Sequence, residues 1–189
     1  MSRRTLDTDR VVATAATLAD SEGLDAVTLT RVANELGVRQ PALYRHVDGF
    51  DAMIRLLGLR GREILADRLA AAAVGVAGDE AVRAVGSAWR EMVRDHPGLY
   101  AATDRYPCAG DAELEGAVDK VVAVLGRALA AYELSDDEQV HVARTMRAAF
   151  HGFAHLESGD GFPQPHDTDD TFDHLLDLLC SGIQPRASR

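Results

Sequence analysis

Apolar residues recur at intervals of three and four along almost the whole chain, and this period restricts the possible folds more than any other feature of the sequence. Residues three and four apart share one face of an α-helix, whereas a half-buried strand needs strict alternation. Alanine and leucine, both good helix formers, lead the 47% of hydrophobic residues. A chain of 189 residues can also bury a core without disulfides. We therefore predict an all-α fold of about nine helices and exclude an all-β fold.

Start and stop signals divide this pattern into segments. Thr28 is a suitable N-cap, Pro41 suits a first helical turn, and Ser135 to Glu138 has the spacing of a capping box. The helical periodicity covers residues 8–22, 29–36, 41–47, 51–73, 82–93, 99–100, 114–129, 136–157 and 172–183. Glycine and proline between residues 158 and 167 predict a flexible connection before the last helix.

The net charge of −10 is distributed unevenly along the chain. The first 47 residues hold six basic and six acidic side chains, so the whole deficit lies in residues 48–189. DNA repels an acidic surface and needs basic groups for its phosphates. We therefore expect only the neutral N-terminal part to approach nucleic acid.

The sequence carries no sign of a membrane or secretory protein. No apolar run reaches the roughly 20 residues of a membrane span, and residues 1–10 lack the apolar core of a signal peptide. Cys108 and Cys180 lie far apart and match no zinc or redox spacing. We expect a soluble, cytoplasmic protein with two reduced thiols and no membrane partner.

Two short predicted helices separated by a glycine, residues 29–36 and 41–47, have the outline of a helix-turn-helix. Leu43 and Val47 form an inward apolar pair on the second of them. The remaining face carries Arg39, Gln40, Pro41, Ala42, Tyr44, Arg45 and His46. Gln can bind adenine N6 and N7, Arg can bind guanine, small apolar side chains can touch a thymine methyl, and Tyr can donate to phosphate. This set favours DNA recognition, although an ordinary helical hairpin has the same outline.

Two strings in this region are similar to the DNA-binding head of the TetR family. They are Thr28-Leu29-Thr30-Arg31-Val32-Ala33 and Gly37-Val38-Arg39-Gln40-Pro41-Ala42-Leu43-Tyr44-Arg45-His46-Val47. The resemblance, which covers roughly residues 8–57, implies contacts to bases and to the DNA backbone. It assigns base contacts to Gln40, Pro41 and Ala42, and backbone contacts to Thr28, Thr30, Tyr44 and His46.

One departure from the family concerns the start of the fourth predicted helix. The family commonly has a phosphate-binding lysine there, and this chain has Phe50. The resemblance then implies that more of the anchoring falls to Arg3, Arg4 and Arg45.

The rest of the chain resembles one class of TetR C-terminal domain. The similar strings are Ser87-Ala88-Trp89, His96-Pro97-Gly98-Leu99-Tyr100 and Phe150-His151-Gly152-Phe153-Ala154 with Leu156-Glu157. This implies a DNA-binding domain at residues 1–48 and a ligand-binding and dimerisation domain at residues 49–189. Large, polarisable side chains there can line an apolar pocket, although plain core packing would also use them. The predicted pocket residues are Trp89, Met92, Tyr100, Met146, Phe150, His151 and Phe153.

His151 and His155 stand four residues apart, a spacing that can place two imidazoles on one metal ion. No glutamate completes an HExxH pattern, and His141 lies ten residues before His151. The acidic residues at Asp167, Asp169, Asp170 and Asp173 better fit the first turn of a helix, where they complement its dipole. We therefore expect neither a metal nor another cofactor.

These observations predict a ligand-responsive transcriptional regulator, a repressor released from a palindromic DNA operator by a small-molecule effector. The sequence does not encode the sign of regulation, so an activator is an alternative. The last two helices are expected to form a homodimer, because Leu175, Leu176, Leu178 and Leu179 cover more than one face. A helical-bundle enzyme that uses His151, His155 and nearby carboxylates is the alternative. It lacks a phosphate loop, a nucleophile elbow and a metal signature. A helical adaptor that binds only proteins would leave the face from Gln40 to His46 without a purpose.

Overall fold

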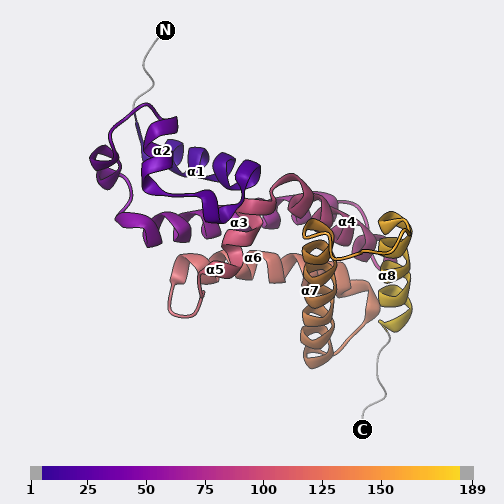
Figure 1. Ribbon diagram of the computed structural model, residues 1–189. Coiled ribbons are helices and arrows are strands. Elements are labelled where there is room, and N and C mark those ends of the chain that lie inside the picture. Colours follow the sequence, from indigo (N-terminus) through magenta and orange to yellow (C-terminus); the bar gives the residue numbers. More distant parts are fainter. Residues whose placement is uncertain (1–5, 184–189) are drawn as a thin grey trace. The chain divides into compact units, whose positions relative to one another are not determined.

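A computed structural model describes residues 6–183, which contain α-helices and short 3₁₀ helices and no strand (Figure 1). The α-helices are α1 (Thr8–Glu22), α2 (Leu29–Glu35), α3 (Gly49–Ala72), α4 (Asp79–Asp95), α5 (Pro97–Arg105), α6 (Ala112–Leu129), α7 (Asp136–Ser158) and α8 (Thr168–Gly182). The 3₁₀ helices are η1 (Leu24–Ala26), η2 (Gln40–Arg45) and η3 (Ala130–Tyr132). The predicted all-α fold is confirmed. No helix between residues 6 and 183 is long and apolar enough to cross a membrane.

The chain divides into two compact units. The first unit holds residues 1–63 and 95–115, and the second holds residues 64–94 and 116–189. The predicted DNA-binding domain, residues 1–48, therefore falls within the first unit. That unit also takes in the first part of α3 and all of α5, which the sequence had placed in the other domain.

In the first unit, α5 packs against α1 and is held at both ends by charged side chains. Asp20 of α1 accepts a hydrogen bond from the Leu99 backbone N–H at 2.8 Å and lies 2.8 Å from the His96 ring. At the other end, the buried Arg62 of α3 donates to the backbone carbonyls of Thr103 and Tyr106. An anion at the N-terminus and a cation at the C-terminus both complement the helix dipole.

Gly98 lets the two helices come this close. A Cβ atom at this position would lie 1.9 Å from the Ala19 carbonyl oxygen and 2.7 Å from the Asp20 nitrogen. Both atoms belong to the backbone of α1, so a side chain at position 98 cannot be accommodated by a change of rotamer. The His-Pro-Gly-Leu-Tyr string, residues 96–100, is therefore a docking site for α1.

In the second unit, α4 packs against α7 and α8 around an apolar core. Trp89 lies 6.2 Å from Phe150, and Phe153 lies 4.9 Å from Phe172, measured between ring centroids. Helix α7 opens with the predicted capping box, in which Ser135 and Glu138 each bond the other's backbone. Asp167 caps α8 by accepting from the Asp169 N–H at 2.8 Å, as the acidic cluster predicted. Cys180 is buried, Cys108 is partly buried, and neither forms a disulfide.

An ion pair between a buried arginine and partly exposed carboxylates joins these helices. The Arg90 guanidinium binds Glu157 with a 2.8 Å hydrogen bond from Nε and lies 2.7 Å from Asp169. It also lies over the rings of Phe153 and Phe172, at 5.3 and 4.9 Å from their centroids. Burial of the Arg90 charge costs hydration free energy, which offsets much of what the ion pair contributes to stability.

We expect Glu157→Gln to make the stability of the folded protein less dependent on pH in the acidic range. The hydrogen bond with Arg90 lowers the pKa of Glu157 below its ordinary value of 4.5. The ionised carboxylate therefore stabilises the folded state above that value, and this stabilisation is lost as the pH falls through the lower, folded-state pKa. The urea concentration at the midpoint of unfolding should fall less between pH 7 and pH 3.5 in Glu157→Gln than in the wild type. Glu91→Gln replaces an exposed carboxylate next to Arg90 in the sequence, and its urea midpoint should shift between the two pH values as much as that of the wild type.

Candidate nucleic-acid interface

The helix-turn-helix is built by a threonine cap, a glycine turn and a short second helix. The Thr28 hydroxyl accepts from the Arg31 N–H at 3.2 Å and starts α2, as predicted. Gly37 follows α2 with a φ of 67°, in the left-handed region that glycine enters without strain. Residues 40–45 then form η2.

The second helix is a 3₁₀ helix, and the prediction of an ordinary α-helix at residues 41–47 is wrong in this respect. The Ala42 N–H bonds the Arg39 carbonyl at 2.9 Å, and the His46 N–H bonds the Leu43 carbonyl at 2.8 Å. These three-residue bonds suit a segment in which Pro41 has no N–H to donate. The inward pair is as predicted, because Leu43 is 0% and Val47 is 3% exposed.

The predicted DNA-contacting residues lie on the surface of the first unit. The exposed members are Thr28, Thr30, Arg39, Pro41, Tyr44 and Arg45, and the half-buried members are Gln40, Ala42 and His46. Neither Arg39 nor Arg45 forms an ion pair with another residue of the described chain. Both guanidinium groups are therefore available to phosphates or to guanine.

Gln40 is held by a neighbour on each side. The Thr30 hydroxyl donates to Gln40 Oε1 at 2.8 Å, and Gln40 Nε2 lies 3.4 Å from the Tyr44 hydroxyl. An amide has two acceptor and two donor positions, so one of each remains for a base. The remaining pair is what an adenine edge requires. Thr30 and Tyr44 were expected to contact the DNA backbone, and neither bond to Gln40 was predicted: Thr30 lies ten residues from Gln40, and the signal from Tyr44, four residues away, was not used.

Helix α1 fixes the end of η2. The Thr8 hydroxyl donates to the His46 carbonyl at 3.1 Å. Arg31 forms an ion pair with Glu22 at 2.7 Å, so its charge is already neutralised within the first unit. Arg3 and Arg4 lie outside the described residues. Phe50 is 45% exposed and lines a cavity of about 230 Å³ in the first unit.

The residues predicted to line a ligand pocket are distributed over both units. Tyr100 belongs to the first unit and the others belong to the second. Most are buried, with exposed fractions of 7% or less, and His151 is half-buried. These positions suit core packing as well as a pocket, and their role as ligand contacts stays a prediction.

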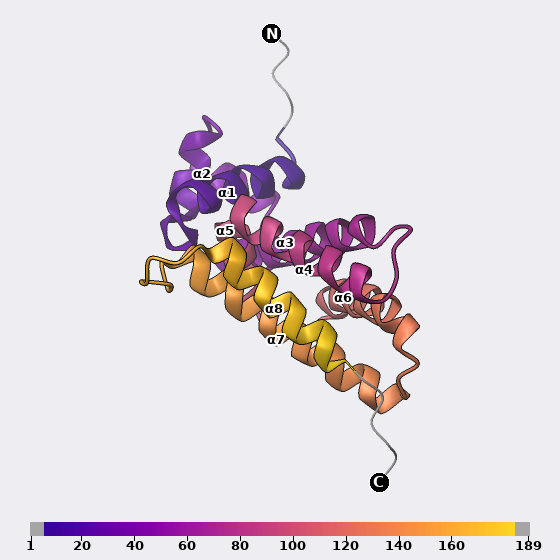
Figure 2. The ribbon, with the colours of Figure 1, turned by 90° about the vertical axis from the view of Figure 1, so that its right-hand side faces the viewer.

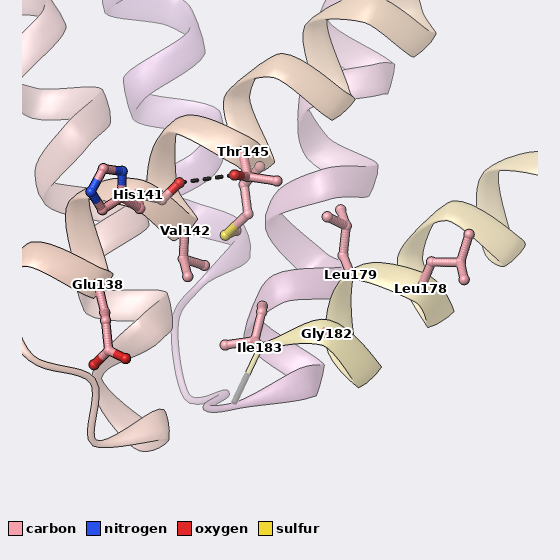
Figure 3. A pocket seen from close by; sticks show the side chains of 9 residues that line it. Glu138, His141, Val142, Thr145, Leu178, Leu179, Gly182 and Ile183 are labelled. Atoms are coloured by element: carbon pink, nitrogen blue, oxygen red, sulfur yellow. Dashed lines mark hydrogen bonds between the residues drawn. The ribbon is translucent and has the colours of Figure 1, made fainter. Parts of the chain in front are cut away.

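A groove of about 280 Å³ lies between α7 and α8 (Figure 3). Its apolar wall includes Val142, Met146, Leu179 and Ile183, and Glu138, His141 and Thr145 add polar groups. Met146 is the one member of the predicted pocket set among the residues that line this groove. Leu178 stands at its edge with 62% of its surface exposed.

His151 and His155 stack on α7, with ring centroids 6.0 Å apart. Among residues 6–183, no group of three or more His, Cys, Asp or Glu side chains is gathered in a way that could hold a metal ion.

Comparison with known proteins agrees with this architecture. A family model described as "Tetracyclin repressor-like, C-terminal domain" matches residues 82–179, and one described as "Bacterial regulatory proteins, tetR family" matches residues 11–54. An uncharacterized HTH-type transcriptional regulator of Mycobacterium tuberculosis is 32% identical over 188 residues, covering 97% of this chain and 84% of that protein. The chain belongs to the TetR family of transcriptional regulators. The resemblance read from the two head strings is thereby confirmed.

Solved TetR-like structures share the fold of this regulator over nearly its whole length. The structure of BioQ with its double-stranded DNA operator matches at a TM-score of 0.72 and 25% identity, covering 96% of this chain and all of that one. ActR of Streptomyces coelicolor, solved in complex with (S)-DNPA, matches at a TM-score of 0.67 and 21% identity, covering 95% of this chain and 97% of that one. The likeness to ActR concerns the fold alone.

Proposed function

We propose that this TetR-family regulator is a repressor that binds a palindromic operator as a homodimer and leaves it when a small molecule binds. The observation that carries the proposal is the outward face of η2, with Gln40 held between Thr30 and Tyr44. A purely structural hairpin has no need for an oriented amide at its surface. BioQ, which was solved on its operator, supports the same use of the fold.

The proposal divides the work between residues 1–48, which read DNA, and residues 49–189, which bind the effector and a second copy. Two recognition segments must lie about 34–36 Å apart to enter successive major grooves. A ligand that changes this separation weakens binding to the operator without touching the DNA. ActR carries a small molecule in its structure. The effector is expected to contact the predicted pocket residues, which are Trp89, Met92, Tyr100, Met146, Phe150, His151 and Phe153. A protein with this role acts in the cytoplasm, where the DNA is, and needs no catalytic centre.

Gln40→Ala tests base recognition directly. Operator DNA would first be selected from a random duplex pool with the full-length protein. We expect the substitution to weaken binding to the selected site by about 1–3 kcal/mol and to leave binding to an unrelated duplex nearly unchanged. Fluorescence anisotropy at fixed salt would measure both affinities.

Thr30→Val is the companion variant, because it keeps the shape of the side chain and removes the hydroxyl that bonds Gln40, together with any contact of that hydroxyl to the DNA backbone. It should broaden the base preference at one position and cost less affinity than Gln40→Ala. Equal losses on selected and unrelated DNA would refute base reading by Gln40. Failure to select any site would refute the proposed function itself.

A further inference from the structure

The cavity of about 230 Å³ that Phe50 lines belongs entirely to the first unit. Its walls come from η1, from the first two turns of α3 and from the end of α5. Because η1 precedes α2 and α3 follows η2, these walls include the segments on both sides of the helix-turn-helix. The residues predicted to line the effector pocket take no part in the cavity. Its lining residues are Leu24, Asp25, Phe50, Asp51, Ile54, Arg105 and Tyr106.

Contacts within the first unit hold the cavity wall at the end of α5. Helix α5 packs against α1 and against η1, which follows α1 in the chain (Figure 2). The Tyr106 carbonyl accepts a hydrogen bond at 3.2 Å from Arg62, a buried residue of α3. Arg55, also on α3, binds the Asp111 carboxylate through Nε and Nη2 at 2.5 and 2.7 Å. Both ends of the segment 106–111 are therefore tied to α3, and a largely preformed cavity is typical of small-molecule sites.

The lining of the cavity is mostly apolar and partly aromatic. Leu24 and Ile54 are buried, each with 8% of its surface exposed, and Phe50 and Tyr106 are the aromatic members. Phe50 is 45% exposed, so a molecule can reach it from the solvent. The faces of aromatic rings carry partial negative charge and attract cations. The lining therefore suits a molecule that combines apolar groups with a positive charge.

One carboxylate of the cavity has no partner in the described chain. Asp25 forms an ion pair with Arg105, so these two charges cancel. Asp51 is exposed, and its side chain forms neither an ion pair nor a hydrogen bond with another residue between 6 and 183. A bound anion would meet the Asp51 carboxylate, whereas the Arg105 guanidinium is already neutralised. The uncompensated charge of the cavity is therefore negative and complements a cation.

We propose that this cavity binds a small organic cation, an ammonium group that carries apolar substituents. The ammonium group lies near Asp51 and against the aromatic side chains, and the substituents contact Leu24 and Ile54. The volume is below the roughly 300–1,000 Å³ of sites for drug-sized molecules, which limits the occupant to a smaller one. This site goes beyond the proposed function, because it lies in the unit that carries η2 and shares no residue with the predicted effector pocket.

Benzyltrimethylammonium is the probe for this site, with benzyl alcohol and benzoate as its neutral and anionic counterparts. Calorimetric titration of the full-length protein would measure the affinities, and NMR would locate the bound cation through the backbone amide signals. We expect the cation to bind at least about tenfold more tightly than either counterpart. Its signals should shift in η1 and in the first turns of α3. Benzoate bound as tightly as the cation, or shifts confined to the second unit, would overturn the proposal.

Two substitutions separate the contribution of the carboxylate from that of the ring. Asp51→Asn removes the charge, and Phe50→Leu removes the aromatic face but keeps an apolar side chain. Each should weaken binding of the cation about fivefold. Both positions are exposed, so neither change should unfold the protein.

Asp9→Asn is the matched control for the charge. Asp9 is an exposed aspartate of α1 that does not line the cavity, so this variant should bind the cation as the wild type does. Equal weakening by Asp9→Asn and Asp51→Asn, or wild-type binding in both cavity variants, would show that the cation binds elsewhere and would refute the proposal. Selection of operator DNA depends on none of these results, so the proposed function is tested separately.

Discussion

Gly98→Ala is expected to unfold the first unit, or to destabilise it by about 3 kcal/mol or more. The new methyl group would lie within 2 Å of the Ala19 carbonyl oxygen, so α1 and α5 must move apart. That movement also breaks the hydrogen bond from Leu99 to Asp20. Urea unfolding and amide hydrogen exchange of residues in α1 would measure the loss.

Gly116→Ala is the matched control for this substitution. Gly116 also lies inside a helix, and a Cβ atom there would meet nothing within 4 Å. Alanine is the better helix former by about 0.5–1 kcal/mol, so this variant should be slightly more stable than the wild type. A Gly98→Ala protein with normal stability would mean that α1 and α5 are not in contact in solution.

Leu178→Asp is expected to convert the proposed homodimer to a monomer and to weaken binding to the operator strongly, although η2 is untouched. Leu178 is 62% exposed, so a charge there costs the isolated protomer little, whereas it would be costly in the proposed dimer interface, where it would lose water. A monomer engages one half-site, and the affinity falls by the contribution of the second. Leu175, which the leucine pattern also marks, is half-buried and would be a poorer choice because its replacement disturbs the protomer.

Val74→Asp is the matched control for Leu178→Asp. Val74 is 77% exposed and follows α3, away from α7 and α8 in the sequence. Sedimentation and anisotropy of this variant should match the wild type. If Leu178→Asp kept its dimer and its operator affinity, the interface would have to be placed on other helices.

Local chemistry made the helices predictable. The Thr28 cap, Pro97 in the first turn of α5 and the capping box at Ser135 each satisfy backbone groups within a few residues of themselves. Such capping signals act within one helical turn, so a single sequence is enough to predict where these helices begin. The same holds for the inward direction of Leu43 and Val47, which follows from their spacing.

The remaining features depend on residues distant in sequence. The apolar pattern of α4 gave no sign that Arg90 would be buried against Glu157, 67 residues later. Docking of α5 onto α1 joins Asp20 to Leu99 across 79 residues. The 3₁₀ form of η2 was missed because the apolar pair at Leu43 and Val47 fits an α-helical turn equally well.

The shortness of η2 has a consequence for how such a regulator can diverge. Leu43 is the only buried side chain among its six residues, and the end of the segment is held by Thr8 of α1. Substitutions of exposed side chains usually change stability by less than about 0.5 kcal/mol. The exposed Tyr44 and Arg45 can therefore be exchanged while the protein stays folded. If η2 reads DNA as proposed, substitutions at these positions give a gene copy a new target promoter without compensating changes elsewhere in the chain.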